Sequence, residues 1–290
     1  MEQISFSAIG TSWQIDIDQQ LARYERELLF ERVKRRIDIF DRAYSRFRPD
    51  SLVTEMSQKA GTFTLPPDAG PMLAVYRLMY ELTDGLMTPL IGQALSDAGY
   101  DATYSLETKE MYVPPAWDDV MEWNAPTLSL RRPALLDFGA AGKGYLIDII
   151  ADVLADAGIR SFTVDAGGDM LHRDPSGKAL RVGLEHPLDF QQVIGVASIA
   201  NQSLCGSAGN RRAWGRFHHI LNPQTLASPR DIAAIWVVAE TTLLADALTT
   251  ALFFVPASRL EPHVAFEYVI VRSDFSLEMS PGFPGEIFTG

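Results

Sequence analysis

The sequence predicts an α+β fold, in which helices pack against mixed or antiparallel sheets. Predicted strands outnumber long helices, and several strands follow one another directly, whereas a doubly wound sheet would alternate strands with helices. The 290 residues, of which 47% are hydrophobic, are enough to build one full core. We therefore expect a single domain over residues 1–290, with room for two closely packed subdomains.

The apolar pattern places the elements of the N-terminal half. Residues 12–18 alternate as a strand, and apolar residues then recur at helical spacing over 19–41. Ser51 opens a short helix after a polar turn, because serine is a preferred residue at helix starts. Residues 69–83 form the next predicted helix, and 84–100 is rich in loop residues.

The C-terminal half is richer in strands and contains two further helices. In chain order, its predicted elements are an irregular segment over 114–133 with a strand near 127–130, a strand from 134, a helix over 143–157, a strand over 161–165, strands up to about 221, a helix over 242–254 and a strand near 267–272.

Charge and cysteine content exclude some classes of function. The net charge is −12 and no five like charges are consecutive, so the basic face of a nucleic-acid-binding protein is missing. A single cysteine, Cys205, excludes an internal disulfide framework, and we expect it to be buried. Because no leader-like N-terminal segment and no run of roughly 20 apolar residues occurs, we expect a cytoplasmic protein without a membrane anchor in this chain.

DFGAAGKGYLID, from Asp137 to Asp148, has the pattern of a strand end, a glycine-rich loop and a helix start. Glycines let the backbone approach a ligand, and the N–H groups at a helix start favour an anion. Lys143 adds positive charge where phosphate oxygens would lie, although Gly144 replaces the Ser or Thr of a P-loop. The alternative is a tight turn with an exposed lysine, and the AGGD run at 166–169 also has the pattern of a turn.

LADALTTALF places Asp246 and Thr250 four residues apart in an apolar helix. At that spacing the two side chains share one helical face, and an apolar helix seldom buries a carboxylate without a partner. Magnesium prefers oxygen ligands and needs few protein carboxylates when a nucleotide supplies phosphates. The alternative is an acid near a helix N-terminus with a threonine that bonds back to its own helix.

FHHILNP contains adjacent histidines, His218 and His219, downstream of the serine- and arginine-rich turn that begins at Ser207. On a strand the two imidazoles point to opposite faces, so only one of them faces a site. Histidine titrates nearest to neutral pH and is therefore a candidate general base. The alternative is a structural role, which is the commoner one for histidine.

Together and in this order, these segments resemble the ApbE family of magnesium-dependent FAD:protein FMN transferases. The resemblance extends over nearly the whole chain. The matching segments are IGTSW at 9–13, FRPDSLVTEMS at 47–57, TDGLMTPLIGQALSDAGYD at 83–101, DFGAAGKGYLID at 137–148, TVDAGGDM at 163–170, HHILNPQT at 218–225 and ADALTTALF at 245–253.

The resemblance implies a T-fold-like architecture, a magnesium site and an FAD site. The family carries the metal on the aspartate and threonine of A-D-A-x-x-T, here Asp246 and Thr250, with the backbone of Ala140 and with Thr249 beside them. The implied FAD contacts are Asp137, Lys143, Leu86, Met87, Thr88, Ser207 and Ile220. Met87 and Thr88 depart from the family, which has Phe and Asp there, so the flavin wall differs in this chain.

The resemblance also implies a reaction carried by His219, Lys143 and Asp246. A Ser or Thr hydroxyl of an acceptor flavoprotein attacks the FMN phosphorus of FAD, His219 takes the proton, and AMP leaves. Lys143 and magnesium on Asp246 stabilise the charge on the phosphates. Two alternatives remain open: a magnesium-dependent FAD pyrophosphatase, in which water replaces the hydroxyl, and a protein that binds FAD without turnover.

Overall fold

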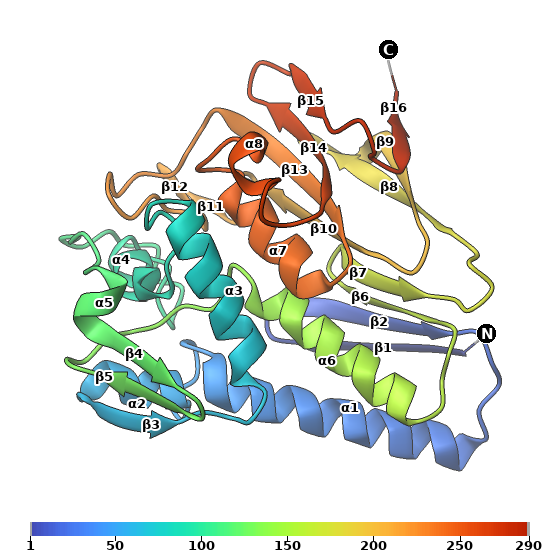
Figure 1. Cartoon of the computed structure of the whole chain (residues 1–290), viewed down its shortest axis with the longest axis horizontal. Helices are drawn as coiled ribbons and strands as arrows, with labels where there is room; N and C mark the ends of the chain where they lie inside the picture. Colours follow the sequence, from blue (N-terminus) through green and yellow to red (C-terminus); the bar gives the residue numbers. More distant parts are fainter. Residues whose placement is uncertain (1, 289–290) are drawn as a thin grey trace.

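An eight-stranded antiparallel sheet organises the molecule (Figure 1). The computed structural model describes residues 2–288. Neighbouring strands follow the order β1-β2-β6-β7-β10-β13-β14-β15, and each of these pairs is antiparallel. The strands are β1 (Glu2–Ala8), β2 (Thr11–Ile17), β6 (Phe162–Ala166), β7 (Asp169–Arg173), β10 (Ser203–Ala208), β13 (Ile232–Ala239), β14 (Glu267–Arg272) and β15 (Leu277–Met279).

Smaller sheets surround the large one. A three-stranded sheet, β16-β9-β8, packs on one of its faces, a second one, β3-β5-β4, lies near the N-terminal helices, and β11 pairs with β12. Their strands are β3 (Gly61–Thr64), β4 (Met121–Asn124), β5 (Thr127–Leu130), β8 (Leu180–His186), β9 (Asp189–Ile199), β11 (Ala213–Trp214), β12 (Phe217–His218) and β16 (Gly285–Ile287).

Two layers of helices cover the other face of the large sheet. The inner layer is α6 (Gly142–Asp156) and α7 (Thr242–Ala251), which contact each other and the central strands. In the outer layer, α1 (Arg23–Tyr44) packs on α6, and α3 (Ala69–Leu82) packs on α7 (Figure 1). The shorter helices are α2 (Leu52–Gln58), η1 (Pro89–Ile91), α4 (Gly92–Asp97), α5 (Trp117–Val120) and α8 (Ala257–Leu260).

The central strand β13 shows why this sheet is buried on both faces. Its Ile235 and Val237 belong to the cluster shared with the helices, whereas Trp236 and Val238 belong to the cluster under the β8–β9 sheet. A strand buried on both faces is apolar throughout instead of alternating, as IAAIWVVA is. The α+β class is therefore confirmed. One hydrophobic cluster has members from Ile4 to Ile270, and the single domain over residues 1–290 stays a prediction.

Several element boundaries differ from the sequence-based expectation. The predicted strand from residue 134 is wrong: Ala134 N–H donates to the Met56 carbonyl and Asp137 N–H to the Pro89 carbonyl, so the segment bonds to two separate elements and not to a ladder. The prediction that 84–100 is rich in loop residues missed η1 and α4. η1 begins at Pro89, and the Thr88 side chain caps it.

Further strands and short helices escaped the pattern. The strands β1, β3, β4, β15 and β16 and the helices α5 and α8 were not expected, because each is short or half-exposed and lacks a clear apolar period. The central strand β13 was not expected either, because it is apolar throughout and therefore does not alternate. The first long helix begins at Arg23 and not at residue 19, and it continues to Tyr44.

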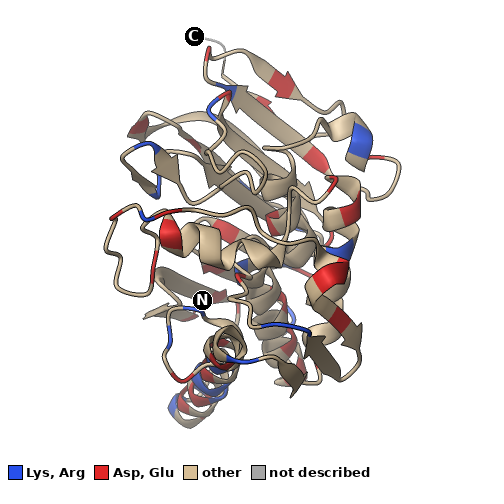
Figure 2. Ribbon diagram, turned by 90° about the vertical axis from the view of Figure 1, so that its left-hand side faces the viewer, with Lys and Arg blue, Asp and Glu red and all other residues tan. Residues whose placement is uncertain are grey.

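The surface charges are mixed, as the composition predicts. Lys and Arg residues alternate with Asp and Glu residues along α1, which is seen end-on in Figure 2. Among the helices within residues 2–288, none is both long enough and apolar enough to cross a membrane.

Candidate functional site

The glycine-rich loop and the C-terminal signature meet where α6 begins. Gly144 N–H donates to the Asp246 carboxylate at 2.8 Å, although 102 residues separate them. A Cβ at position 144 would collide with the Thr242 carbonyl and with Asp246 Cβ. The glycine is thus required for the close approach of α6 and α7, a role that sequence reasoning missed because the partner helix is so distant in sequence.

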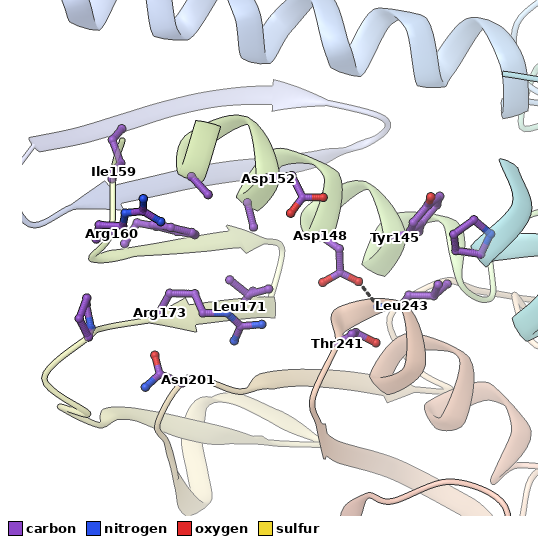
Figure 3. Close-up of a pocket in the computed structure, with 15 residues that line it drawn as sticks. Tyr145, Asp148, Asp152, Ile159, Arg160, Leu171, Arg173, Asn201, Thr241 and Leu243 are labelled. Carbon is purple, nitrogen blue, oxygen red and sulfur yellow. Dashed lines mark hydrogen bonds between the residues drawn. The ribbon is translucent and has the colours of Figure 1, made fainter. Parts of the chain in front are cut away.

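A second contact ties the same helices in the opposite direction. Asp148 of α6 accepts hydrogen bonds from the N–H groups of the first two residues of α7, Thr242 (2.9 Å) and Leu243 (2.8 Å). The bond to Leu243 is drawn in Figure 3. Burial raises the pKa of Asp148, although these two bonds favour its charged form. Each helix therefore supplies a carboxylate to backbone N–H groups of the other, which fixes their relative position.

Asp148 also lines a groove of about 530 Å³ between α6, α7 and the strands β6 and β7 (Figure 3). Asp152, Arg160 and Arg173 contribute the other charged side chains of this groove. None of the predicted catalytic or metal residues is among those that line it, so the groove is separate from the site predicted by the motifs.

Asp246 is a buried carboxylate with a raised pKa. It is 7% exposed, and burial, followed by the negative charge of Asp169, raises its pKa to about 7. Thr250 lies one turn further along α7 and is half-buried, whereas the Thr249 hydroxyl donates to the Asp246 carbonyl at 2.7 Å. The back-bonding threonine is therefore Thr249, whereas the Thr250 hydroxyl makes no hydrogen bond within residues 2–288.

The donor set at Asp246 fits magnesium. It consists of oxygen atoms only: the Asp246 carboxylate, the Thr250 hydroxyl and, by the resemblance, the Ala140 carbonyl. Ala140 lies in the loop just before α6, where its N–H donates to the Tyr76 hydroxyl at 3.2 Å. Within residues 2–288 no group of three or more His, Cys, Asp or Glu side chains is arranged to hold a metal, so a metal here would have one protein carboxylate and would depend on substrate oxygens.

Lys143 is not the exposed lysine of a simple turn. Its ammonium forms an ion pair with Asp169 of β7 and donates to the Ala166 carbonyl at 3.3 Å. Burial alone would lower the pKa of Lys143, but the charges of Asp169 and Asp246 raise it. The buried Asp169 also accepts from Gly206 N–H at 2.9 Å. The AGGD run is a tight turn, as expected, but its last residue belongs to the site.

Asp137 is held by an arginine that the motifs did not indicate. Arg46, at the end of α1, forms an ion pair with Asp137 and donates to the Tyr100 carbonyl at 2.6 Å. The second Asp137 oxygen accepts from Gly139 N–H at 2.7 Å, which shapes the glycine-rich loop. Because the side chain of Arg46 is 2% exposed, its charge is used inside the molecule. The role of Arg46 is visible only from its ion pair with Asp137, which lies 91 residues further along the sequence.

The two histidines have different environments. His218 uses both ring nitrogens: Nε2 donates to the Pro229 carbonyl at 2.7 Å, and Nδ1 accepts from Ile220 N–H at 3.3 Å. His219 Nδ1 is buried and has no partner within the described residues. Burial, followed by the charge of Arg212, lowers the pKa of His219 to about 3, so its imidazole is neutral at neutral pH. β12 ends at His218, so the expectation that both histidines lie on a strand is wrong.

The remaining predicted FAD contacts are placed less directly. Met87 and Ile220 are buried in the main hydrophobic cluster, and Thr88 caps η1 with its side chain. Leu86 and Ser207 are half-buried. Within the described chain, no side-chain hydrogen bond joins Leu86, Met87, Thr88 or Ser207 to Lys143, Asp246 or His219. These residues therefore stay predictions from the resemblance.

Comparisons with known proteins show what this chain is similar to. Among curated relatives, the FAD:protein FMN transferase of Escherichia coli K12 is 24% identical over 95% of this chain and 86% of its own length. One from Rhodobacter capsulatus is 26% identical over 66% of this chain, and the match spans only 39% of that longer protein.

Solved structures share the fold. The flavin transferase ApbE from Vibrio cholerae superposes with a TM-score of 0.81 at 20% identity over 97% of both chains. The ApbE protein from Thermotoga maritima gives 0.82 at 21% identity over 98% of this chain and 99% of its own. A profile of the ApbE family matches residues 9–267, and the chain therefore belongs to the ApbE family.

Proposed function

We propose that this chain is a magnesium-dependent FAD:protein FMN transferase, which moves FMN from FAD to a Ser or Thr hydroxyl of an acceptor flavoprotein and releases AMP. The contact between Gly144 N–H and Asp246 carries the proposal, because it brings the predicted metal residue to the predicted phosphate loop. The names of the relatives support the same activity.

The residues of the loop would bind and orient the pyrophosphate of FAD. In the first turn of α6, Gly142 N–H donates to the Phe138 carbonyl and Gly144 N–H to Asp246, so the Lys143 N–H would be the backbone group that meets a phosphate oxygen. Asp246, Thr250 and the Ala140 carbonyl would hold magnesium, with Thr249 beside them, and the metal would supply charge neutralisation at the phosphates. Lys143, held by Asp169, adds a fixed positive charge nearby.

His219 would remove the proton of the attacking hydroxyl. Its Nδ1 has no partner within the described residues, so it is the ring nitrogen that we assign to accept the proton. As the hydroxyl oxygen bonds to the FMN phosphorus, the bond from that phosphorus to the bridging oxygen breaks. AMP leaves with that oxygen, and the acceptor keeps FMN as a phosphoester.

The test measures both products of the reaction. The purified chain is incubated with FAD and magnesium, with and without a pool of Ser- and Thr-containing peptides, and AMP, FMN and peptide masses are followed by chromatography and mass spectrometry. AMP release with an FMN mass on a peptide supports transfer. AMP with equal free FMN in both conditions would identify the chain as a pyrophosphatase, and FAD binding without AMP would overturn both activities.

A further inference from the structure

A short hairpin places an arginine directly beside His219. In it, Ala213 pairs with His218 and Trp214 with Phe217. His219 N–H donates to the Arg212 carbonyl at 3.1 Å, so these two residues lie opposite each other directly beyond the ends of β11 and β12. Directly opposed residues share a face, with Cβ atoms about 5 Å apart. Arg212 and His219 therefore project from the same side of the hairpin.

That side of the hairpin faces the residues around the glycine-rich loop. Because side chains alternate along a strand, Trp214 shares the face of Arg212. Trp214 Nε1 donates to the Ala98 carbonyl at 2.7 Å, and its ring stacks on Tyr100 at 5.4 Å. The Tyr100 ring lies 4.9 Å from the guanidinium of Arg46, which holds Asp137 in the loop. The hairpin is thus anchored against the site.

Arg212 carries a positive charge that the described chain does not neutralise. Its side chain is exposed, and no carboxylate within residues 2–288 forms an ion pair with it. Lys143, in contrast, is already paired with Asp169. After burial, the charge of Arg212 is the next cause of the lowered pKa of His219. The guanidinium of Arg212 therefore has no partner carboxylate within the described residues, and it belongs to a residue beside His219, the predicted base.

The neighbouring Arg211 provides an internal comparison. It does not lie opposite His219, and its guanidinium forms an ion pair with Glu185 at 2.6 Å. The two arginines have the same charge and adjacent positions, but only Arg212 shares the face of His219. An effect on FAD binding that is seen on changing Arg212 but not on changing Arg211 must therefore come from the position of Arg212 beside His219. It cannot come from the net charge of the loop.

We propose that Arg212 binds the pyrophosphate of FAD through its guanidinium, as a second cation opposite Lys143. This inference rests on the proposed function, because it assigns a further residue to the same substrate. A guanidinium presents a planar fork of donors that matches two phosphate oxygens, whereas an ammonium acts as a point charge. Its position beside His219 puts that fork next to the phosphorus that the deprotonated hydroxyl oxygen attacks.

The test compares FAD with riboflavin, which has the same flavin ring and no phosphate. Arg212→Gln should weaken FAD binding by about tenfold or more, measured as the Kd from flavin fluorescence, because hydrogen bonds to charged groups contribute this much. Riboflavin affinity should stay within about twofold, and Arg212→Lys should be intermediate. The matched control Arg211→Gln should change neither Kd by more than about twofold.

Several outcomes would overturn the assignment. Equal losses in Arg212→Gln and Arg211→Gln would mean a general charge effect, and an equal loss of riboflavin would mean damage to the flavin wall. Unchanged FAD affinity with slower transfer would place Arg212 at the acceptor instead. If the unmodified chain binds FAD but never releases AMP, the proposed function fails, while the differential loss in Arg212→Gln still supports the phosphate contact.

Discussion

Asp246 joins burial to a position at the contact between two helices. In the folded chain its pKa is about 7, well above the ordinary value of an aspartate near 3.9. Between about pH 4 and 7 the folded state therefore binds more protons than the unfolded state, so the free energy of unfolding should fall as the pH rises through that window. A cation beside the carboxylate would oppose this loss.

The first prediction concerns magnesium and the stability of the fold. At pH 8 and with FAD present, magnesium should raise the thermal midpoint of the unmodified chain, by an amount that corresponds to about 2.7 kcal/mol at a concentration 100 times its Kd. Asp246→Asn should lose this response and also lose turnover. At pH 5 the response of the unmodified chain should be smaller, because protons compete for the carboxylate. A full magnesium response in Asp246→Asn would contradict the metal assignment.

The second prediction separates the charge of Lys143 from its ion pair. Lys143→Ala leaves Asp169 buried without its cation, which should cost about 3 kcal/mol of unfolding free energy. The double variant Lys143→Ala/Asp169→Ala should be more stable than the single one, as measured by urea unfolding. FAD affinity should be weakened in both variants. If the single and double variants unfold at the same urea concentration, the ion pair has no net role in the fold.

The third prediction distinguishes the histidines by different readouts. His219→Ala should slow single-turnover AMP release by at least tenfold, because general-base help contributes about 10²–10⁴ in rate, and its FAD affinity should change little. His218→Ala should affect release mildly and instead lower stability by about 1–3 kcal/mol, since it leaves the Pro229 carbonyl and Ile220 N–H without a partner. Equal small losses of rate would exclude both as the base and leave Asp169 as the next candidate.

At the scale of elements, α6 and α7 act as a pair because their ties run both ways. Asp148 holds the start of α7, and Asp246 receives the Gly144 N–H of α6. Thr241 adds a side-chain cap to α7 by accepting from Leu244 N–H at 3.3 Å. Two caps on one ten-residue helix leave little freedom for Asp246 to shift relative to the loop.

The fourth prediction tests this positioning role. Asp148→Ala should lower the unfolding free energy by about 1–2 kcal/mol, the usual cost of losing a helix cap. It should also raise the magnesium concentration needed for half-maximal AMP release, which a purely structural change far from the site would not do. Asp152→Ala, one turn further along α6, is the control, because within the described chain Asp152 accepts no hydrogen bond from the N–H groups of α7. An unchanged magnesium requirement in Asp148→Ala would refute the role.

At the scale of the whole molecule, local patterns predicted what depends on neighbours in sequence. Asp246 and Thr250, which are four residues apart, do lie on one buried helix. The elements α3, α6, β6 and β14 lie close to their expected ranges. The order of the motifs was enough to identify the family, which the profile match confirms.

What could not be predicted depends on contacts between distant segments. Nothing near Arg46 indicates that it pairs with Asp137, and nothing near Gly144 indicates that α7 needs its missing side chain. The segment that leads to the glycine-rich loop reads as a strand by composition, yet no neighbouring strand is there to pair with it. Tertiary partners decide such cases, and a single sequence does not list them.

The mutual tie of α6 and α7 has a practical consequence for cutting the chain in two. The turn between β7 and β8 is exposed at Ser176 and Gly177, so a break there would interrupt no helix or strand. One fragment would keep Lys143 and Asp148, and the other would keep Asp246 and Thr250. Neither fragment alone holds both halves of the site, so FAD capture by the mixture would signal that the fragments have reassembled. Because the two signatures lie on different fragments, this fold is suited to a sensor that reports when two fragments bind each other.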